Sequence, residues 1–111
     1  MSQEGGSVVV VLTTGPDRET LMEIGRKVVK DRLAACVNIL DGMNSIYWWE
    51  GEIQDDRETV LIAKTREVLL PALIERVKAL HSYSCPCVVA LPILAGNPEY
   101  LTWLREEARP A

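Results

Sequence analysis

The chain lacks any run of basic residues longer than the pair Arg26-Lys27, although it is 111 residues long. Its 16 acidic and 12 basic side chains give a formal net charge of −4 at pH 7. Because nonspecific binding to nucleic acid depends on clustered Lys and Arg that neutralise phosphates, we expect no nucleic-acid partner.

Long apolar stretches are also missing. The longest, residues 88–94, contains Pro92 and is far shorter than the ~20 residues that a membrane-spanning helix needs. A signal peptide begins with basic residues and a longer apolar stretch, whereas here a start without basic residues precedes only five apolar ones, 8–12. We therefore expect no membrane partner and a cytoplasmic location.

Cysteine is too scarce for a scaffold of structural disulfides. The chain has three, an odd number, and Cys85 and Cys87 are very close in sequence. We expect free thiols in a reducing compartment. With 48% hydrophobic and 25% charged residues, the composition is that of one globular domain over 1–111, of which we expect 1–6 to be disordered.

Hydrophobic periodicity predicts three helices and several extended segments, of which the second and third belong to one strand interrupted at Asp41-Gly42. The apolar, β-branched run Val8–Val11 is typical of a strand in the middle of a sheet, and Pro71 is allowed in the first turn of a helix. The expected extended segments are 7–14, 35–40, 46–53, 58–65 and 87–91, and the expected helices are 17–33, 67–80 and 98–108. The 35–40 strand is broken at Asp41-Gly42, where glycine permits a bulge or a bend.

Segments 46–53 and 58–65 form one long hairpin around the polar turn 54–57, so that the chain order is β-α-β-β-α-β plus a C-terminal helix. This order predicts an α+β, ferredoxin-like fold with an antiparallel sheet. If the turn centres on Asp55-Asp56, then Tyr47, Trp49 and Ile53 share one face with Lys64, and Trp48 lies on the other. The fold hosts many functions and does not choose among them.

Six short segments resemble, in order, the CutA divalent-cation tolerance family. They are VLTTGPD (11–17), RLAACVN (32–38), YWWEG (47–51), KTR (64–66), HSYSCP (81–86) and YLTWL (100–104). The resemblance implies a ferredoxin-like subunit of a tight homotrimer, similar in plan to PII-type signalling proteins and linked to tolerance of metal ions, copper in particular. It implies no enzymatic reaction and no required cofactor. Its partners would be other copies of the chain, and a small ligand, a metal ion or a protein loop in clefts between subunits.

The sequence departs from the family pattern at two positions relevant to metal. Thr13 stands where some members have cysteine, and Cys87 stands where many have an acidic residue after the proline. A metal site with the ligands His81, Cys85 and Cys87 is one hypothesis, because imidazole and two thiolates suit Cu(I) or a divalent metal such as Zn(II). The alternative is that both cysteines are core residues. A Cys–His catalytic dyad has no third residue nearby to orient it, so we expect no enzyme.

The aromatic segment of the hairpin has three interpretations: core, ligand cleft or subunit interface. Aromatic side chains are enriched at interfaces, and a small monomer has little room to bury three of them. We predict a trimer interface at Tyr47, Trp48, Trp49 and Ile53. We predict an inter-subunit ligand cleft at Tyr47, Trp49, Lys64, His81 and Tyr83. The acidic residues of 50–58 are expected to be a solvated hairpin tip rather than a cation site.

Overall fold

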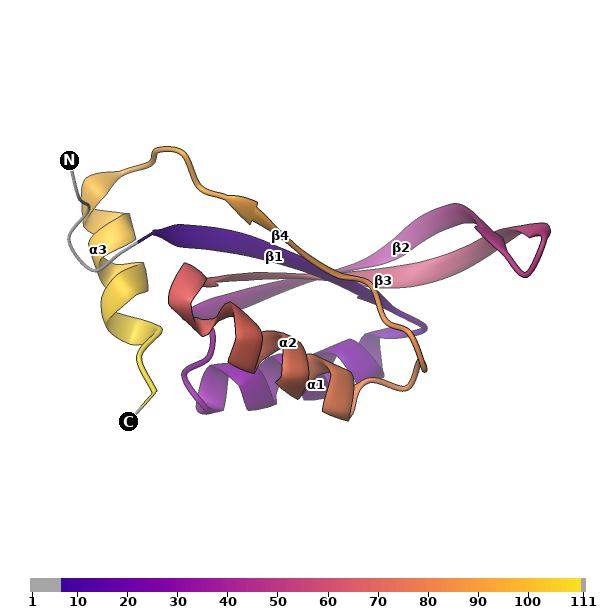
Figure 1. Ribbon diagram of the computed structural model, residues 1–111, viewed down its shortest axis with the longest axis horizontal. Helices are drawn as coiled ribbons and strands as arrows, with labels where there is room; N and C mark the ends of the chain where they lie inside the picture. The colour runs from indigo at the N-terminus through magenta and orange to yellow at the C-terminus, as the bar shows by residue number, and fades with distance from the viewer. Residues whose placement is uncertain (1–6, 111) are drawn as a thin grey trace.

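The computed structural model describes residues 7–110, so the expected disorder of 1–6 lies outside the described residues. Its elements follow the predicted order (Figure 1). They are β1 (Val8–Gly15), α1 (Arg18–Lys30), β2 (Cys36–Trp49), β3 (Glu52–Arg66), a 3₁₀ turn η1 (Glu67–Leu69), α2 (Leu70–Leu80), β4 (Val88–Pro92) and α3 (Pro98–Glu107).

The four strands form one antiparallel sheet in the order β2-β3-β1-β4. Helices α1 and α2 lie side by side on one face of this sheet, and α3 lies at the end opposite the hairpin tip (Figure 1). The predicted α+β class and antiparallel sheet are confirmed. Among residues 7–110, no helix has the length and apolar character needed to cross a bilayer.

The core lies between the sheet and the two helices. Alternate residues of the strands, among them Val11 and Leu61, point into it and meet Leu21 and Ile24 of α1 and Leu73 of α2. Within residues 7–110, no helix covers the centre of the opposite face of the sheet (Figure 1), to which the other half of the strand side chains point. The apolar side chains of this face are half-buried or exposed: Val10, Leu12, Leu40, Val60, Ile62, Val89 and Leu91.

Local sequence explains where the helices begin and end. Asp17 caps α1 by accepting a hydrogen bond from the Thr20 backbone N–H at 2.8 Å. The helix stops at Lys30, short of the predicted 33, and Arg32 has a positive φ of 59°. Pro71 lies in the first turn of α2, as predicted, and Asn97 caps α3.

The hairpin of β2 and β3 projects far beyond β1 and β4 (Figure 1), which gives the molecule extents of 47 × 26 × 22 Å. The predicted turn at Asp55-Asp56 is wrong, because the chain reverses at Glu50-Gly51, with φ of 51° and 81°. Two successive positive φ values are typical of the two-residue turn that matches strand twist, and glycine adopts the second one without strain.

The earlier turn changes the predicted faces. Ile53 follows the turn, so it belongs to β3 and pairs with Trp48. It therefore lies on the face of Trp48, opposite Tyr47 and Trp49, which is a second correction. The predicted bulge at Asp41-Gly42 is confirmed by the shift in register between Leu40 and Met43, but β2 continues through it as one strand.

Candidate functional site

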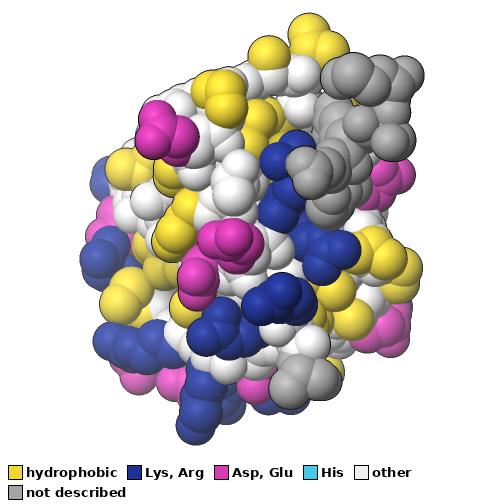
Figure 2. All heavy atoms as spheres, turned by 90° about the vertical axis from the view of Figure 1, so that its left-hand side faces the viewer, with side chains coloured by type: hydrophobic (Ala, Val, Ile, Leu, Met, Phe, Trp, Pro, Cys, Tyr) yellow, Lys and Arg dark blue, Asp and Glu magenta, His cyan; other side chains and the backbone are white. Residues whose placement is uncertain are grey.

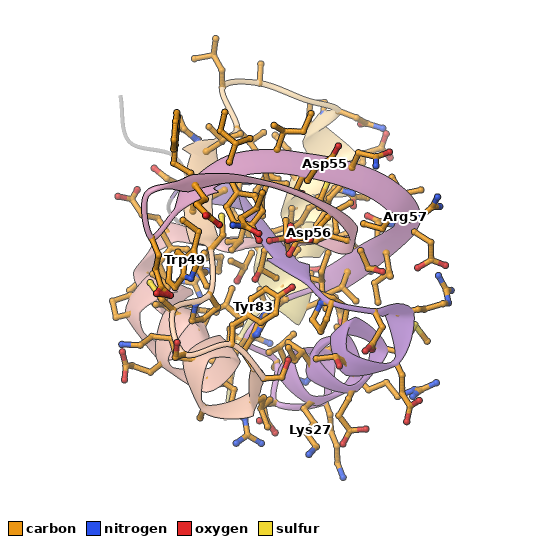
Figure 3. The ribbon with its side chains drawn as sticks, turned by 90° about the vertical axis from the view of Figure 1, so that its right-hand side faces the viewer. Lys27, Trp49, Asp55, Asp56, Arg57 and Tyr83 are labelled. Atoms are coloured by element: carbon orange, nitrogen blue, oxygen red, sulfur yellow. The ribbon has the colours of Figure 1, made fainter. Side chains whose placement is uncertain are left out.

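The candidate residues surround the point where the hairpin leaves the body of the sheet. Here the connection from α2 to β4 passes the end of β1, and Tyr83 in this connection donates from Oη to Glu58 of β3 at 2.8 Å. Glu58 is buried, with 8% of the residue exposed. Figure 3, viewed from the hairpin end, shows Tyr83 between the hairpin and the helices. The contact thus joins the loop to the base of the hairpin.

His81 fixes the start of this connection. Its Nδ1 accepts the backbone N–H of Tyr83 at 3.0 Å, and its Nε2 lies 2.6 Å from the carbonyl oxygen of Thr14. Because a carbonyl only accepts, Nε2 is the donor of this hydrogen bond. The ring also lies 4.8 Å from that of Tyr83. Both ring nitrogens are therefore occupied, and neither points to an open ligand position.

Burial raises the pKa of Tyr83 far above its ordinary value of 10.0, and the hydrogen bond to the Glu58 carboxylate acts in the same direction. The phenol therefore stays protonated and remains a donor to Glu58 through the physiological pH range. The Tyr83–Glu58 bond is a structural clamp rather than a proton-transfer pair.

The predicted trimer-interface residues are exposed in the single chain. The exposed fractions are 40% for Tyr47, 71% for Trp48, 51% for Trp49 and 62% for Ile53. Tyr47 donates to Asp56 at 2.5 Å, and this hydrogen bond raises the pKa of its phenol. The hairpin thus carries apolar groups on both faces with no cover within the described chain.

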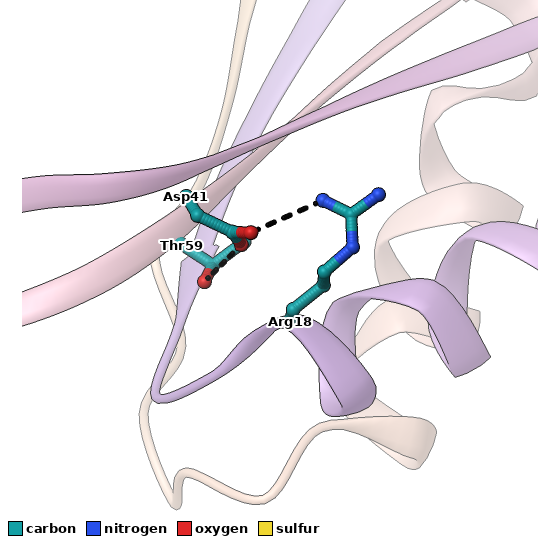
Figure 4. A network of polar contacts seen from close by, with 3 residues as sticks. All are labelled: Arg18, Asp41 and Thr59. Carbon is teal, nitrogen blue, oxygen red and sulfur yellow. Dashed lines mark hydrogen bonds and ion pairs between the residues drawn. The ribbon is translucent and has the colours of Figure 1, made fainter.

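A polar network missed by the sequence analysis holds the base of the hairpin to α1 (Figure 4). Asp41, in the bulge, accepts from Arg18 at 3.3 Å and from the hydroxyl of Thr59 at 3.2 Å. The only sequence signal was Gly42, which marks the bulge that places Asp41 here. The ion pair is half-exposed and contributes less than ~1 kcal/mol to stability.

The five residues of the predicted ligand cleft fall into separate groups within one chain. Lys64 donates to Asn38 at 3.1 Å and lies 5.9 Å from the centre of the Tyr100 ring. Lys64 and Gln54, the partner of Tyr47, are ten residues apart on β3, which is about 33 Å. A cleft that contains all five needs more than one copy of the chain.

The proposed metal ligands do not converge in the single chain. Cys85 and Cys87 are exposed in the single chain, so neither lies in the core of that chain. Within residues 7–110, no three His, Cys, Asp or Glu side chains gather closely enough to hold a metal ion. Both ring nitrogens of His81 already make hydrogen bonds. The accessible soft ligands between α2 and β4 are therefore the thiols of Cys85 and Cys87.

The end of the molecule at α3 has a second polar cluster that the sequence analysis did not identify. Arg32 donates to the carbonyl oxygen and the carboxylate of Glu107, at 3.2 and 3.0 Å, and Arg66 donates to the carbonyl of Ala108. Figure 2 shows basic side chains gathered on this face. These contacts satisfy the free carbonyls at the end of α3, so their role is structural.

Residues 9–107 match the family described as "CutA1 divalent ion tolerance protein". The chain is 55% identical over 97 residues to the divalent-cation tolerance protein CutA of Thermus thermophilus, covering 87% of this chain and 94% of the relative. It is 50% identical over 101 residues, 91% of this chain, to the chloroplastic protein CutA 1 of Oryza sativa, but spans only 57% of that relative's length.

Solved structures agree with this relationship. The crystal structure of CutA1 from Oryza sativa has a TM-score of 0.91 and 48% identity, covering 96% of this chain and 97% of that one. The Thermus thermophilus divalent cation tolerance protein has a TM-score of 0.88 and 53% identity, covering 90% and 97%. The chain therefore belongs to the CutA1 divalent ion tolerance protein family.

Proposed function

We propose that this protein acts in tolerance of divalent cations, copper in particular, as a cytoplasmic homotrimer similar in plan to PII-type signalling proteins. Its clefts between copies would bind a small ligand, a metal ion or the loop of a partner protein. The proposal assigns no catalytic reaction. The names of the relatives supply the link to divalent cations, and the hairpin supplies the argument for assembly.

The observation that carries the proposal is the uncovered apolar hairpin. Ile46, Trp48 and Ile53 share one face of it, and their exposed fractions are 70%, 71% and 62%. Burial of a side chain of this size contributes about 1.5–3 kcal/mol, so a surface of this kind favours association. The uncovered apolar sheet face and the two free edges, β2 and β4, offer a second copy both packing and strand pairing.

Closure into a ring would limit the number of copies that associate. Each copy has one projecting hairpin and one open sheet face, which are different surfaces, so the contact between copies is head-to-tail. Head-to-tail contacts form rings when the rotation closes, and three is the number that the family resemblance implies. The predicted cleft requires that such a ring bring Tyr47 and Trp49 of one copy close to Lys64 of another.

The first test measures assembly. Light scattering of the parent should give about three times the 12.4 kDa chain mass. Trp48→Ala should weaken the trimer by about 3–5 kcal/mol, as for Trp→Ala in protein cores. Val68→Ala is the control, because Val68 is 68% exposed but lies outside the hairpin. A parent mass of 12.4 kDa would refute the trimer.

The second test measures function in cells that lack their own member of the family. Growth under raised copper should be restored by the parent and by Val68→Ala, and less by Trp48→Ala if the trimer is the active form. Equal growth with the parent and with an empty vector would refute the role in tolerance. Equal rescue by Trp48→Ala, despite a monomeric mass, would refute the requirement for assembly.

Direct binding of Cu(I) is the alternative function, and the exposure of both Cys85 and Cys87 supports it. Thiolates are the ligands that Cu(I) prefers, and His81 would be a third ligand only after one of its hydrogen bonds breaks. In anaerobic titrations, Cys85→Ser/Cys87→Ser should lose Cu(I) and Cys36→Ser should retain it. Affinity should fall at lower pH, because protons compete for the thiolates. Equal affinity of the double variant and the parent would eliminate these ligands.

A further inference from the structure

We propose that Cys85 and Cys87 form a reversible disulfide with each other, which makes the connection between α2 and β4 a site of thiol–disulfide exchange. This inference is independent of the proposed function, because it requires neither the trimer nor a metal ion. It rests on the exposure of the two thiols, their spacing, the anchoring of the segment around them and the position of the third cysteine.

The two thiols are accessible. All three cysteines are free, and Cys85 and Cys87 are exposed, whereas Cys36 is half-buried with its Sγ 3.6 Å from the hydroxyl of Tyr100. In thiol–disulfide exchange, a thiolate must reach a sulfur of the disulfide that it attacks. Exposed thiols therefore react before buried ones. The pair also has a free stretch of backbone around it. Within the described chain, neither Ser84 nor Cys85 takes part in a backbone hydrogen bond outside regular elements.

The spacing permits a bond between the two. Residues two apart have Cα atoms at most about 7 Å from each other, and a disulfide needs about 4.4–6.8 Å. A modest local bend therefore brings the sulfurs together. Residues 82–85 already run as bends, and Pro86 has no N–H whose hydrogen bond could be lost on bending.

Anchors on both sides keep the two thiols near each other. On one side, His81 donates its backbone N–H to Val77 at 2.9 Å, and its ring holds Thr14 and Tyr83. On the other side, Val88 follows Cys87 directly and pairs with Thr13 of β1. The segment between these anchors is short, so the effective concentration of each thiol for the other is high.

Cys36 is not an alternative partner. It lies on β2, three strands away from β4 in the order β2-β3-β1-β4, which is about 14 Å across the sheet. Cys36 pairs with Lys64 of β3, and Lys64 pairs with Val10 of β1. Val88 of β4 pairs instead with Thr13, which lies three residues further along β1. A disulfide from Cys36 to either exposed thiol would therefore require the sheet to come apart.

The oxidant is a disulfide of a low-molecular-weight thiol. One protein thiolate attacks a sulfur of this disulfide, forms a mixed disulfide and releases the first small thiolate, which takes up the proton that the protein thiol lost. The second protein thiolate then attacks the protein sulfur of the mixed disulfide and releases the second small thiol. Two protein thiols are oxidised and one external disulfide is reduced. Because the ring that closes is small and exposed, the bond should reopen readily with excess small thiol.

The experiment equilibrates the 111-residue chain in glutathione buffers of increasing oxidised fraction, and then measures its intact mass and the number of thiols that a maleimide can label after denaturation. We expect the parent to lose the mass of two hydrogen atoms and two of its three labelled thiols, and to recover both in reduced glutathione. The Cys36→Ser variant should form the Cys85–Cys87 disulfide as the parent does. Cys85→Ser and Cys87→Ser should each gain one glutathione instead, because the resolving thiol is gone.

Three outcomes would overturn the proposal. The first is a parent that keeps three labelled thiols in oxidised buffer. The second is a parent that gains one glutathione on each exposed thiol without closing the ring. The third is a covalent dimer or trimer that dissociates only on reduction. Because the parent itself gives the decisive mass, the result does not depend on the folding of any variant.

Discussion

Thr13→Val should make the protein more stable. Thr13 lies in the central strand β1, between Leu61 of β3 and Val88 of β4, and is 0% exposed. Its Oγ1 is buried without a hydrogen-bond partner among the described residues. The side chain points toward the helices, so a second copy packed on the open sheet face would not provide one. Valine has nearly the same shape and lacks the hydroxyl.

The magnitude follows from the cost of an unsatisfied buried hydroxyl, which is about 1–3 kcal/mol in protein mutation data. We expect a gain of about 1–2 kcal/mol in the free energy of unfolding, since the added methyl group must still fit. That corresponds to a rise of roughly 4–8 °C in melting temperature for a domain of this size. Thermal and urea denaturation should be measured at one fixed protein concentration, because association contributes to the apparent stability.

Thr65→Val is the matched control. Thr65 is also 0% exposed and lies in a central strand, but its Oγ1 donates to the carbonyl oxygen of Leu33 at 2.6 Å. The same substitution there should cost about 1–3 kcal/mol, because it leaves that carbonyl without its partner. Opposite signs at the two positions are the expected result. A loss of stability in Thr13→Val that matches the loss in Thr65→Val would refute the reasoning.

Two further predictions concern the hairpin turn and the cap of α1. Glu50→Asn should stabilise the protein by about 1 kcal/mol, because Glu50 has a φ of 51° and asparagine adopts this conformation with less strain; an unchanged melting temperature, with the turn intact by hydrogen exchange, would contradict this. The backbone N–H of Thr20 lowers the pKa of Asp17 below 3.8, so the stabilisation by this carboxylate is present above pH 3.8 and is lost as the pH falls through the lower, folded-state value. Asp17→Asn should therefore keep the cap and flatten the acid limb of a stability–pH curve, whereas Asp17→Ala should lose stability at neutral pH as well; identical curves for the three proteins would refute this.

The corrections to the predicted fold share one cause. The polar residues 54–57 suggested a turn, but they are half-buried or exposed strand residues of a hairpin that leaves the sheet. The actual turn contains Glu50, whose positive φ is imposed by pairing of Trp49 with Glu52 and not by its own preference. Charged residues in an exposed strand and in a turn look alike in sequence, because both are solvated.

The sequence indicated candidate residues for the site, but it did not indicate how they are grouped in space. The segments that resemble the family include His81 and Tyr83. In the structure, the centres of these two rings lie 4.8 Å apart. Nothing local indicated that Tyr83 would clamp buried Glu58, or that Arg18 and Thr59 would meet at Asp41. These contacts join residues 18 to 25 positions apart, so they depend on how the elements pack.

The sequence by itself determined the order of elements, the central position of β1, the bulge at Asp41-Gly42 and the resemblance to the family, because periodicity, caps and short motifs are local properties of the chain. Only the tertiary structure decided the turn, the face of Ile53, the two hydrogen bonds that occupy His81 and the exposure of Cys85 and Cys87. Each of these depends on strand register or on the path of a loop across the end of β1. Register and loop path are fixed by the sum of many long-range contacts, which no single stretch of sequence contains.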